Sequence, residues 1–191
     1  MWITTIYILY RINTCQCFHL EWINIGNMSY LRKFFAATLL ANGTVLVTGG
    51  WNIYDIEVQR SAELYDPSTE IWRPTGNMKR DRNLHTTLLL TNEKVLVTGG
   101  LILGILENDS ELYDPSTGTW TTSSSMTHKV VLHTACLLTN GQVPVTGGFK
   151  FYSVDGESTA ELYDPSRDIW TTTDSMYNGR QGHTASLLKS G

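Results

Sequence analysis

Short apolar runs, each bounded by turn residues, recur along the chain. The first kind of run occurs four times, as FAATLL at 35–40, HTTLLL at 85–90, HTACLL at 133–138 and HTASLL at 183–188. A second kind, VLV or VPV, follows the first three of these at 45–47, 95–97 and 143–145. Near-continuous apolar runs of this length predict strands that are covered on both faces. Because no segment has a long helical pattern, the chain is predicted to be all-β.

These runs belong to a larger repeat. VTGG recurs verbatim at 47–50, 97–100 and 145–148, and ELYDPS recurs at 63–68, 111–116 and 161–166. A tryptophan follows each ELYDPS, at Trp72, Trp120 and Trp170. A fixed period of about fifty residues is typical of a repeat architecture.

A Gly-Gly pair after an apolar strand, then a Tyr, then six residues, then a Trp resembles the kelch repeat. The copies combine the glycines at 49–50, 99–100 and 147–148 with Tyr65 and Trp72, Tyr113 and Trp120, and Tyr163 and Trp170. The resemblance covers residues 22–191 and implies a kelch-type β-propeller of the galactose oxidase/kelch-like superfamily, whose blades are four-stranded antiparallel sheets (strands a to d). We expect three complete blades, at about 35–73, 85–121 and 133–171, and a partial blade at each end.

Both ends of the chain carry incomplete repeats. Trp22 is in register with Trp72, which predicts that residues 1–21 are a degenerate stub leading into the last strand of a blade, with Cys15 in the place of the repeat tyrosine. The stub is either the remnant of a signal peptide or an eroded repeat. At the other end, residues 183–191 stop in the turn after a strand a. The partial blades could join as one hybrid blade of a four-bladed ring; the alternative, which we favour, is a fragment of a larger propeller with further kelch blades outside this chain.

Turn chemistry predicts three local features. Asn-Gly at 42–43 and at 140–141 predicts type I′ hairpins between strands a and b, because both central residues of that turn need φ > 0. Glu93 replaces the glycine in the second copy, and a left-handed Glu costs about 1–2 kcal/mol, so another turn type is expected there. Pro144 in the third strand b lacks an N–H, which predicts one lost ladder bond within an intact blade.

Acidic residues that recur in every copy are interpreted as structural, because a binding site must lie where the copies differ. Each ELYDPS aspartate is expected to cap its own turn; these are Asp66, Asp114 and Asp164. Each ELYDPS glutamate is expected to pair with an arginine three residues before a strand a; the glutamates are Glu63, Glu111 and Glu161, and the arginines Arg32, Arg82 and Arg180. Val130 replaces the arginine in the third copy. Pairing within a blade would therefore leave Glu161 without an arginine, and pairing with the following blade would leave Glu111 without one.

The repeated histidines are interpreted in the same way; they are His85, His133 and His183. The first copy has Phe35 at this position, and phenylalanine cannot bind a metal, so we expect these side chains to pack between blades or to form hydrogen bonds to loops. His128 and His19 fall outside the register of the repeat and are predicted to be isolated. The chain has three cysteines, and the Cys15–Cys17 pair has no second Cys or His pair at the spacing of metal ligands. Neither a metal site nor a cofactor is therefore predicted.

Composition excludes several classes of function. Hydrophobic residues make up 41% and charged residues 17% of the 191 residues, as in an ordinary globular protein. The net charge of −4 gives no reason to expect nucleic acid or an anionic membrane as partner.

The superfamily that the chain resembles also includes copper-radical oxidases. The resemblance implies that such an oxidase would need tyrosine, histidine and cysteine side chains at its metal. No adjacent Tyr-His pair, nucleophile elbow or phosphate loop occurs here, so we predict that the protein is not an enzyme.

Sequence variation between the copies indicates where function lies. The a–b and c–d turns, at one end of each blade, are nearly identical in all copies, whereas the b–c loops and the d–a segments at the other end vary. The variable b–c loops carry Trp51, Tyr54, Phe149, Phe151 and Tyr152, and the d–a segments carry Lys79, Arg80, Arg82 and Arg180.

Aromatic and Arg side chains on a shared rim are typical of protein and peptide recognition. The sequence therefore predicts an interaction scaffold whose partner binds the face made by the b–c loops and d–a segments, called the loop face below. Two alternatives remain: these side chains pack only against neighbouring loops, or the chain is an extracellular carbohydrate-binding or galactose-oxidase-like propeller. The b–c loop at 101–106 is unusually apolar and is expected to be buried against a part of the protein that lies outside this chain.

Overall fold

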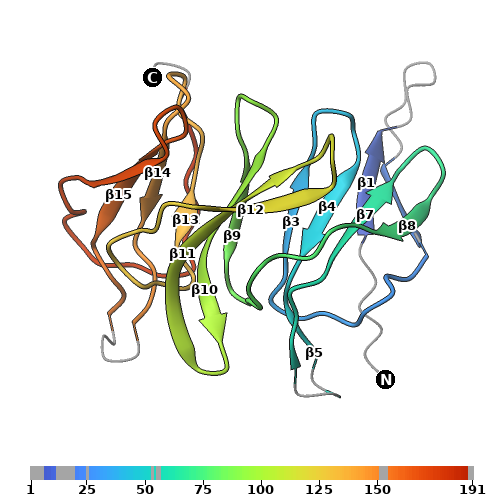
Figure 1. The fold of residues 1–191 in the computed structure, drawn as a ribbon, viewed down its shortest axis with the longest axis horizontal. Coiled ribbons are helices and arrows are strands. Elements are labelled where there is room, and N and C mark those ends of the chain that lie inside the picture. The colour runs from blue at the N-terminus through green and yellow to red at the C-terminus, as the bar shows by residue number, and fades with distance from the viewer. Residues whose placement is uncertain are drawn as a thin grey trace.

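Figure 1 shows a computed structural model of the chain, in which residues 7–11, 20–24, 26–52, 54, 57–150 and 155–188 are described. All regular elements of this described part are strands. It contains no helix that is long and apolar enough to cross a membrane. Three four-stranded antiparallel sheets, each with its strands in chain order, account for most of the structure, and they match the three complete blades predicted from the repeats.

Each blade is a simple meander from an inner strand a to an outer strand d. Blade 1 consists of β3 (Ala36–Leu39), β4 (Val45–Thr48), β7 (Ala62–Asp66) and β8 (Ile71–Pro74). Blade 2 consists of β9 (Thr86–Leu89), β10 (Val95–Ile102), β11 (Ile105–Asp114) and β12 (Thr119–Ser123). Blade 3 consists of β13 (Thr134–Ala135), β14 (Val143–Thr146), β15 (Ala160–Asp164) and β16 (Ile169–Thr172).

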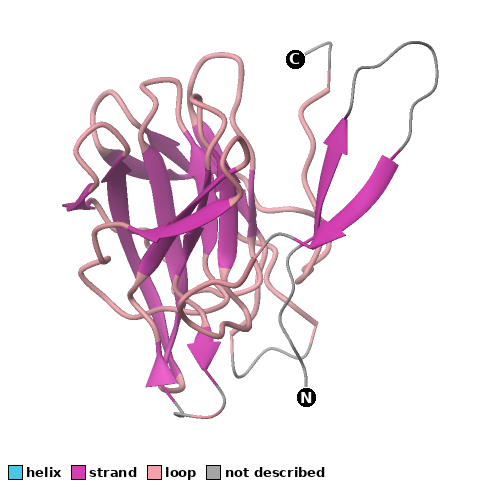
Figure 2. Ribbon diagram, turned by 90° about the vertical axis from the view of Figure 1, so that its right-hand side faces the viewer, coloured by secondary structure: helices cyan, strands magenta, loops and turns pink. Residues whose placement is uncertain are grey.

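Two small sheets complete the described structure. The b–c loop of blade 1 forms a hairpin of β5 (Trp51–Asn52) and β6 (Glu57–Val58), and β1 (Tyr7–Arg11) pairs with β2 (Leu20–Asn24). Figure 2 shows the β1–β2 pair to one side of the three blades. In blade 2 the b–c connection extends the sheet itself, and Figure 1 shows the resulting β10–β11 hairpin projecting from the body.

Neighbouring blades meet along their inner strands and through the repeated Gly-Gly pair. The Thr38 hydroxyl on β3 donates a hydrogen bond to the Thr87 hydroxyl on β9, with 2.6 Å between the two oxygens. Gly49 has a φ of +60°, and a Cβ there would overlap the Arg82 carbonyl oxygen and lie 2.8 Å from the His85 ring. The glycines of VTGG are therefore required because the next blade packs directly on this backbone.

The Tyr-Trp pair of each repeat also joins adjacent blades. The rings of Tyr113 and Trp120 have their centroids 4.9 Å apart in a tilted arrangement. The Tyr113 hydroxyl lies 2.7 Å from the Thr75 hydroxyl, and Trp120 donates its indole N–H to the Gly76 carbonyl at 2.7 Å. Both polar groups thus bond to the strand d region of the preceding blade, which explains why the spacing between Tyr and Trp is fixed.

The repeated histidines pack at the same seams, as predicted. Nε2 of His85 lies 2.7 Å from the Thr48 hydroxyl of the preceding blade. His133 is 6% exposed and lies against Gly99 of blade 2. Burial lowers the pKa of His133 to about 4, so this imidazole is neutral at physiological pH.

The turn-capping role predicted for the ELYDPS aspartates is confirmed. Oδ1 of Asp66 accepts hydrogen bonds from the backbone N–H and the hydroxyl of Ser68, at 2.9 and 2.7 Å. These bonds favour the charged carboxylate and lower the pKa of Asp66. Asp114 and Asp164 make the same pair of bonds to Ser116 and Ser166.

The predicted type I′ turns are wrong. Leu40 and Thr44 enclose a three-residue loop in which the Leu40 carbonyl accepts from the Gly43 N–H at 3.0 Å, and Gly43 is the left-handed residue with a φ of 84°. Glu93 adopts the same conformation, with a φ of 64°, so the different turn expected there is also wrong. The Asn92 carboxamide oxygen accepts the Lys94 N–H at 3.2 Å, and this Asx contact stabilises the loop despite the strain.

Pro144 has the limited effect that was predicted. It pairs in register with Leu162, so blade 3 is intact. The strand on its other side, β13, is reduced to two residues. Cys136 retains only a long bond to the Pro144 carbonyl, at 3.4 Å, because proline has no N–H to return.

The terminal repeats differ from the predictions. In β1–β2 it is Leu9, not Cys15, that stands opposite Trp22, because the partner strand begins at Tyr7; Cys15 itself lies outside the described residues. Residues 183–188 form no strand. Within the described part they do not join β2, so no hybrid blade closes a four-bladed ring.

Candidate functional site

Buried glutamates hold the d–a segments that form part of the loop face. Glu111 accepts hydrogen bonds from the backbone N–H groups of Lys79 and Arg80, at 2.6 and 3.1 Å. Its carboxylate also lies 2.8 Å from Nη2 of Arg82, and both side chains are 0% exposed. Charge-assisted bonds of this kind fix the course of residues 79–82.

The predicted Glu–Arg pairing is confirmed within blades. Arg32 lies 3.0 Å from Glu63 in blade 1, as Arg82 does at a similar distance from Glu111 in blade 2. In blade 3, where the arginine is absent, Nδ1 of His128 lies 2.9 Å from Glu161. His128 also donates its backbone N–H to this carboxylate, so the expectation that it is isolated is wrong.

One residue at the start of each strand a has a left-handed backbone. The φ angles are 56° at Phe34, 55° at Leu84, 55° at Leu132 and 61° at Gly182. These positions form a chain of backbone hydrogen bonds: the Leu84 N–H donates to the Phe34 carbonyl at 2.9 Å, and the Gly182 N–H donates to the Leu132 carbonyl at 2.9 Å. A longer bond of 3.5 Å connects Leu132 to Leu84. The conformation therefore serves to connect each blade to the next.

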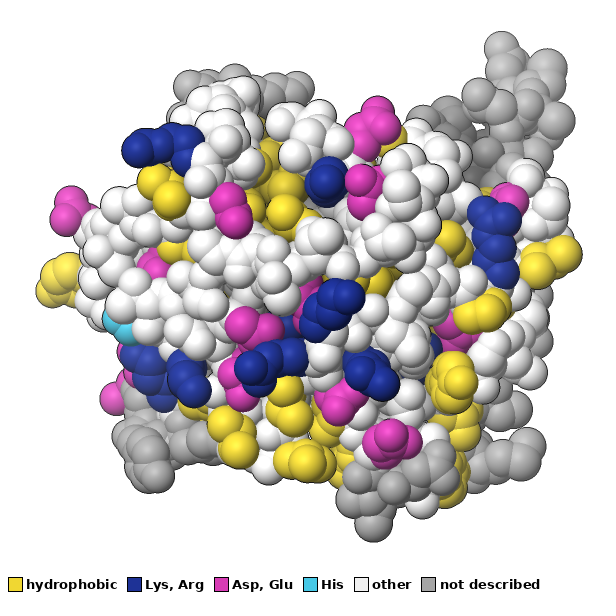
Figure 3. Space-filling model, viewed as in Figure 1, with side chains coloured by type: hydrophobic (Ala, Val, Ile, Leu, Met, Phe, Trp, Pro, Cys, Tyr) yellow, Lys and Arg dark blue, Asp and Glu magenta, His cyan; other side chains and the backbone are white. Residues whose placement is uncertain are grey.

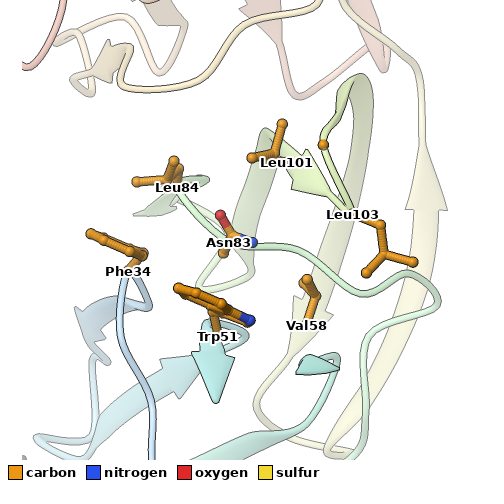
Figure 4. A pocket seen from close by; sticks show the side chains of 8 residues that line it. Phe34, Trp51, Val58, Asn83, Leu84, Leu101 and Leu103 are labelled. Atoms are coloured by element: carbon orange, nitrogen blue, oxygen red, sulfur yellow. The ribbon is translucent and has the colours of Figure 1, made fainter. Parts of the chain in front are cut away.

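An apolar pocket lies on the loop face between blades 1 and 2. It has a volume of about 450 Å³ and is lined by Phe34, Trp51, Val58, Asn83, Leu84, Leu101, Leu103 and Gly104. The b–c loops of both blades and the d–a segments before them contribute to the lining. Figure 4 shows the Asn83 side chain in the middle of these residues, between Trp51 and Leu101.

Three of the lining residues are both apolar and left-handed. Phe34 and Leu84 belong to the chain of backbone bonds, and Leu103 has a φ of 46° at the tip of the β10–β11 hairpin. An apolar side chain in this conformation costs about 1–2 kcal/mol relative to glycine. Phe34 is nevertheless 54% exposed and Leu103 is 76% exposed, so burial within this chain does not offset the strain.

The aromatic residues predicted for the site are dispersed along the loop face. Trp51 lines the pocket, as a member of the β5–β6 hairpin. Tyr54, at the tip of that hairpin, is 65% exposed. Phe149 is half-buried on the other side of blade 2, where its backbone pairs with Val131. Phe151 and Tyr152 lie outside the described residues.

The basic residues divide into exposed and buried ones. Lys79, Arg80 and Arg180 are exposed, and Nε of Arg80 lies 3.7 Å from Asp109. Arg82 is fully buried, so its assignment to a partner-binding surface is wrong: its guanidinium is directed to Glu111 and to the Gly99 carbonyl, at 2.9 Å.

Charged and apolar side chains occupy neighbouring areas of the face seen in Figure 3. Figure 3 shows Lys, Arg, Asp and Glu side chains interspersed across the lower half of the view. Hydrophobic side chains gather below them, at the end from which the β10–β11 hairpin projects in Figure 1. The described part of the chain contains no group of three His, Cys, Asp or Glu side chains that could hold a metal ion.

Sequence reasoning did not identify several lining residues; these are Phe34, Val58, Asn83, Leu84 and Leu103. Leu101 belongs to the apolar b–c loop that was noted but not assigned to the site. One signal was available, because Gly182 occupies the position of Phe34 and Leu84 in the last repeat. A glycine that alternates with exposed apolar residues indicates a left-handed position whose side chain is not required by the turn.

Comparisons with known proteins agree with this architecture. The kelch motif family matches residues 32–79. The chain is similar to the solved structure of YjhT, with a TM-score of 0.71 and 15% sequence identity over 85% of this chain. The match covers 58% of the YjhT chain, so this chain spans somewhat more than half of that protein. No curated protein sequence matches it. Residues 32–79 thus carry a kelch motif, and the chain has the fold of a kelch-type β-propeller.

Proposed function

We propose that this chain is a non-enzymatic interaction scaffold that binds a protein or peptide partner through the loop face. The kelch-type propeller supports the general role of a scaffold. The observation that supports the location is the apolar pocket of about 450 Å³ between blades 1 and 2. A concave apolar site of a few hundred Å³ with a polar rim is the usual form of a site for one anchoring side chain.

The backbone strain of the pocket residues is better explained by ligand binding than by a contribution to the stability of the fold. Phe34 and Leu103 combine left-handed backbones with large exposed fractions, and neither property stabilises the fold. Strained, exposed residues cluster at sites where they contact a ligand. A partner that covers these side chains would bury the apolar surface that this chain leaves in water.

The framework beneath the pocket is rigid. Residues 79–82 are fixed by the Glu111 carboxylate, and Asn83 follows them directly. The Asn83 backbone is then paired with Leu101 in both directions, at 3.1 and 2.8 Å. A preorganised wall of this kind loses little conformational entropy on binding.

A displayed library of random peptides, selected on the purified protein, tests the proposal. Affinities of the selected peptides are measured by calorimetry for the wild type, Trp51→Ala and Leu101→Asp, with Ile71→Asp as the control on the outer strand of blade 1. We expect both pocket variants to weaken binding at least tenfold and the control to leave it unchanged. Peptides that bind all four proteins equally would refute the location, and stoichiometric copper in the purified protein would refute the non-enzymatic role.

A further inference from the structure

Asn83 occupies a fixed place in the wall of the pocket. It is 6% exposed, and its backbone forms an isolated antiparallel bridge with Leu101. The bridge uses both the N–H and the carbonyl of Asn83. The side chain is therefore the only part of this residue that remains available to a ligand.

The Asn83 carboxamide has no hydrogen-bond partner among the residues that the structure describes. Neither its oxygen nor its nitrogen is among the fully buried unpaired atoms, so the carboxamide remains accessible to solvent and to a ligand. The group offers two N–H donors on Nδ2 and an acceptor on Oδ1. Figure 4 shows it among apolar neighbours, with its oxygen and nitrogen between Leu84 and Trp51.

Comparison of the repeats shows that the blade does not need an asparagine here. The corresponding residues are Lys33 in blade 1 and Val131 in blade 3. Both form the same isolated bridge, Lys33 with Trp51 and Val131 with Phe149. The bridge therefore depends on the backbone. Among the three complete blades a carboxamide occurs at this position only in Asn83, and the equivalent Gln181 of the last, partial repeat is exposed.

We propose that Asn83 determines specificity by pairing with a main-chain amide of the bound peptide. Nδ2 donates to a peptide carbonyl and Oδ1 accepts from a peptide N–H, while the neighbouring aliphatic or aromatic side chain of the peptide enters the pocket beside Trp51 and Leu103. This inference rests on the proposed function and adds the chemistry of the partner.

The surroundings of Asn83 favour a neutral amide over a charged group. The other lining residues are Phe34, Trp51, Val58, Leu84, Leu101, Leu103 and Gly104, and none of them carries a charge. A carboxylate or ammonium group placed here would lose its hydration without gaining a counter-ion. A secondary amide needs one donor and one acceptor, and a primary carboxamide supplies both.

The test uses N-acetyl-L-leucine N-methylamide as the probe, because it contains two secondary amides and one aliphatic side chain. Binding is followed by ¹H–¹⁵N NMR at the Trp51 indole and the Asn83 side-chain amide. The main variant is Asn83→Val, which copies the residue that blade 3 already carries at this position. Val131→Asn is the matched control, since it places the same carboxamide at the other seam.

We expect the probe to shift both pocket signals in the wild type and in Val131→Asn, and to bind Asn83→Val at least tenfold more weakly. Asn83→Asp is the second variant; it retains the acceptors, loses the donor and should also weaken binding. Equal binding of the probe by the wild type and by Asn83→Val would overturn the role of Asn83. The proposed function would still stand in that case if the library peptides bind Trp51→Ala more weakly than the wild type. Absence of any shift at the Asn83 amide in the wild type would also overturn it.

Discussion

Arg82 and Glu111 form an ion pair within blade 2, with Nη2 and Oε1 2.8 Å apart and both side chains completely buried. The carboxylate also holds two backbone N–H groups of the d–a segment. A single glutamate therefore holds Lys79, Arg80 and Arg82 in the segment that leads to Asn83.

Glu111→Ala should be strongly destabilising. It leaves the N–H groups of Lys79 and Arg80 without their acceptor and removes one counter-ion of the buried Arg82 guanidinium, which keeps Asp109 at 2.7 Å; the expected loss is therefore at the lower end for a broken buried pair, about 3 kcal/mol. Glu161→Ala should cost less, about 1–3 kcal/mol, because its partner His128 is partly exposed. Urea unfolding of both variants measures the difference, and equal losses would contradict the structural distinction between the two blades.

The free energy of unfolding should decrease as the pH is lowered through the mildly acidic range. The pKa of His133 is lowered from 6.5 to about 4 in the folded protein, so between these values the unfolded chain binds a proton that the folded chain excludes. By linkage this group destabilises the fold progressively as the pH falls from 6.5 to about 4, by up to roughly 3 kcal/mol, and has no effect above 6.5.

His133→Phe is the variant that checks this origin, because the first repeat already has Phe35 at the equivalent position. Chemical denaturation at several pH values should show a shallower decline for the variant than for the wild type. Some slope should remain, since burial also lowers the pKa of His85 well below its usual value. An unchanged slope would show that His133 is protonated in the folded protein.

Phe34→Gly should separate recognition from folding. Glycine relieves the left-handed strain at this position, so stability should be unchanged or higher by about 1 kcal/mol. Peptide binding should weaken at least tenfold, because the Phe34 ring lines the pocket. Leu132→Gly relieves the same strain outside the pocket lining and should leave binding intact; thermal unfolding and calorimetry give the two readouts.

Much of the fold could be predicted because the repeats are nearly verbatim. VTGG and ELYDPS mark strands b and c in every copy, and the apolar runs mark strand a. The predictions of the hairpin turns failed because the same residue types are compatible with more than one turn conformation. Asn-Gly suits both the type I′ turn and the left-handed third position of a longer loop, and Glu93 shows that an Asx contact can support the second form without glycine.

The site was predicted less completely, for a physical reason. Trp51 was identified because it lies in a variable b–c loop. Phe34 and Leu84 were missed because their importance depends on a backbone angle that residue type does not indicate. Arg82 was assigned to the surface from its position in a variable segment, although its length allows it to reach Glu111 inside the blade. Asn83 could be recognised only after its backbone partner Leu101 was known.

The left-handed residues at the start of each strand a have a consequence for how such a protein changes its binding preference. Their backbone groups do the structural work, from Phe34 through Leu84 and Leu132 to Gly182, and the side chains take no part in it. The fold therefore tolerates side chains as different as those of glycine and phenylalanine at these four positions. New ligand preferences can arise by single substitutions at these positions, without any rearrangement of the blades that carry them.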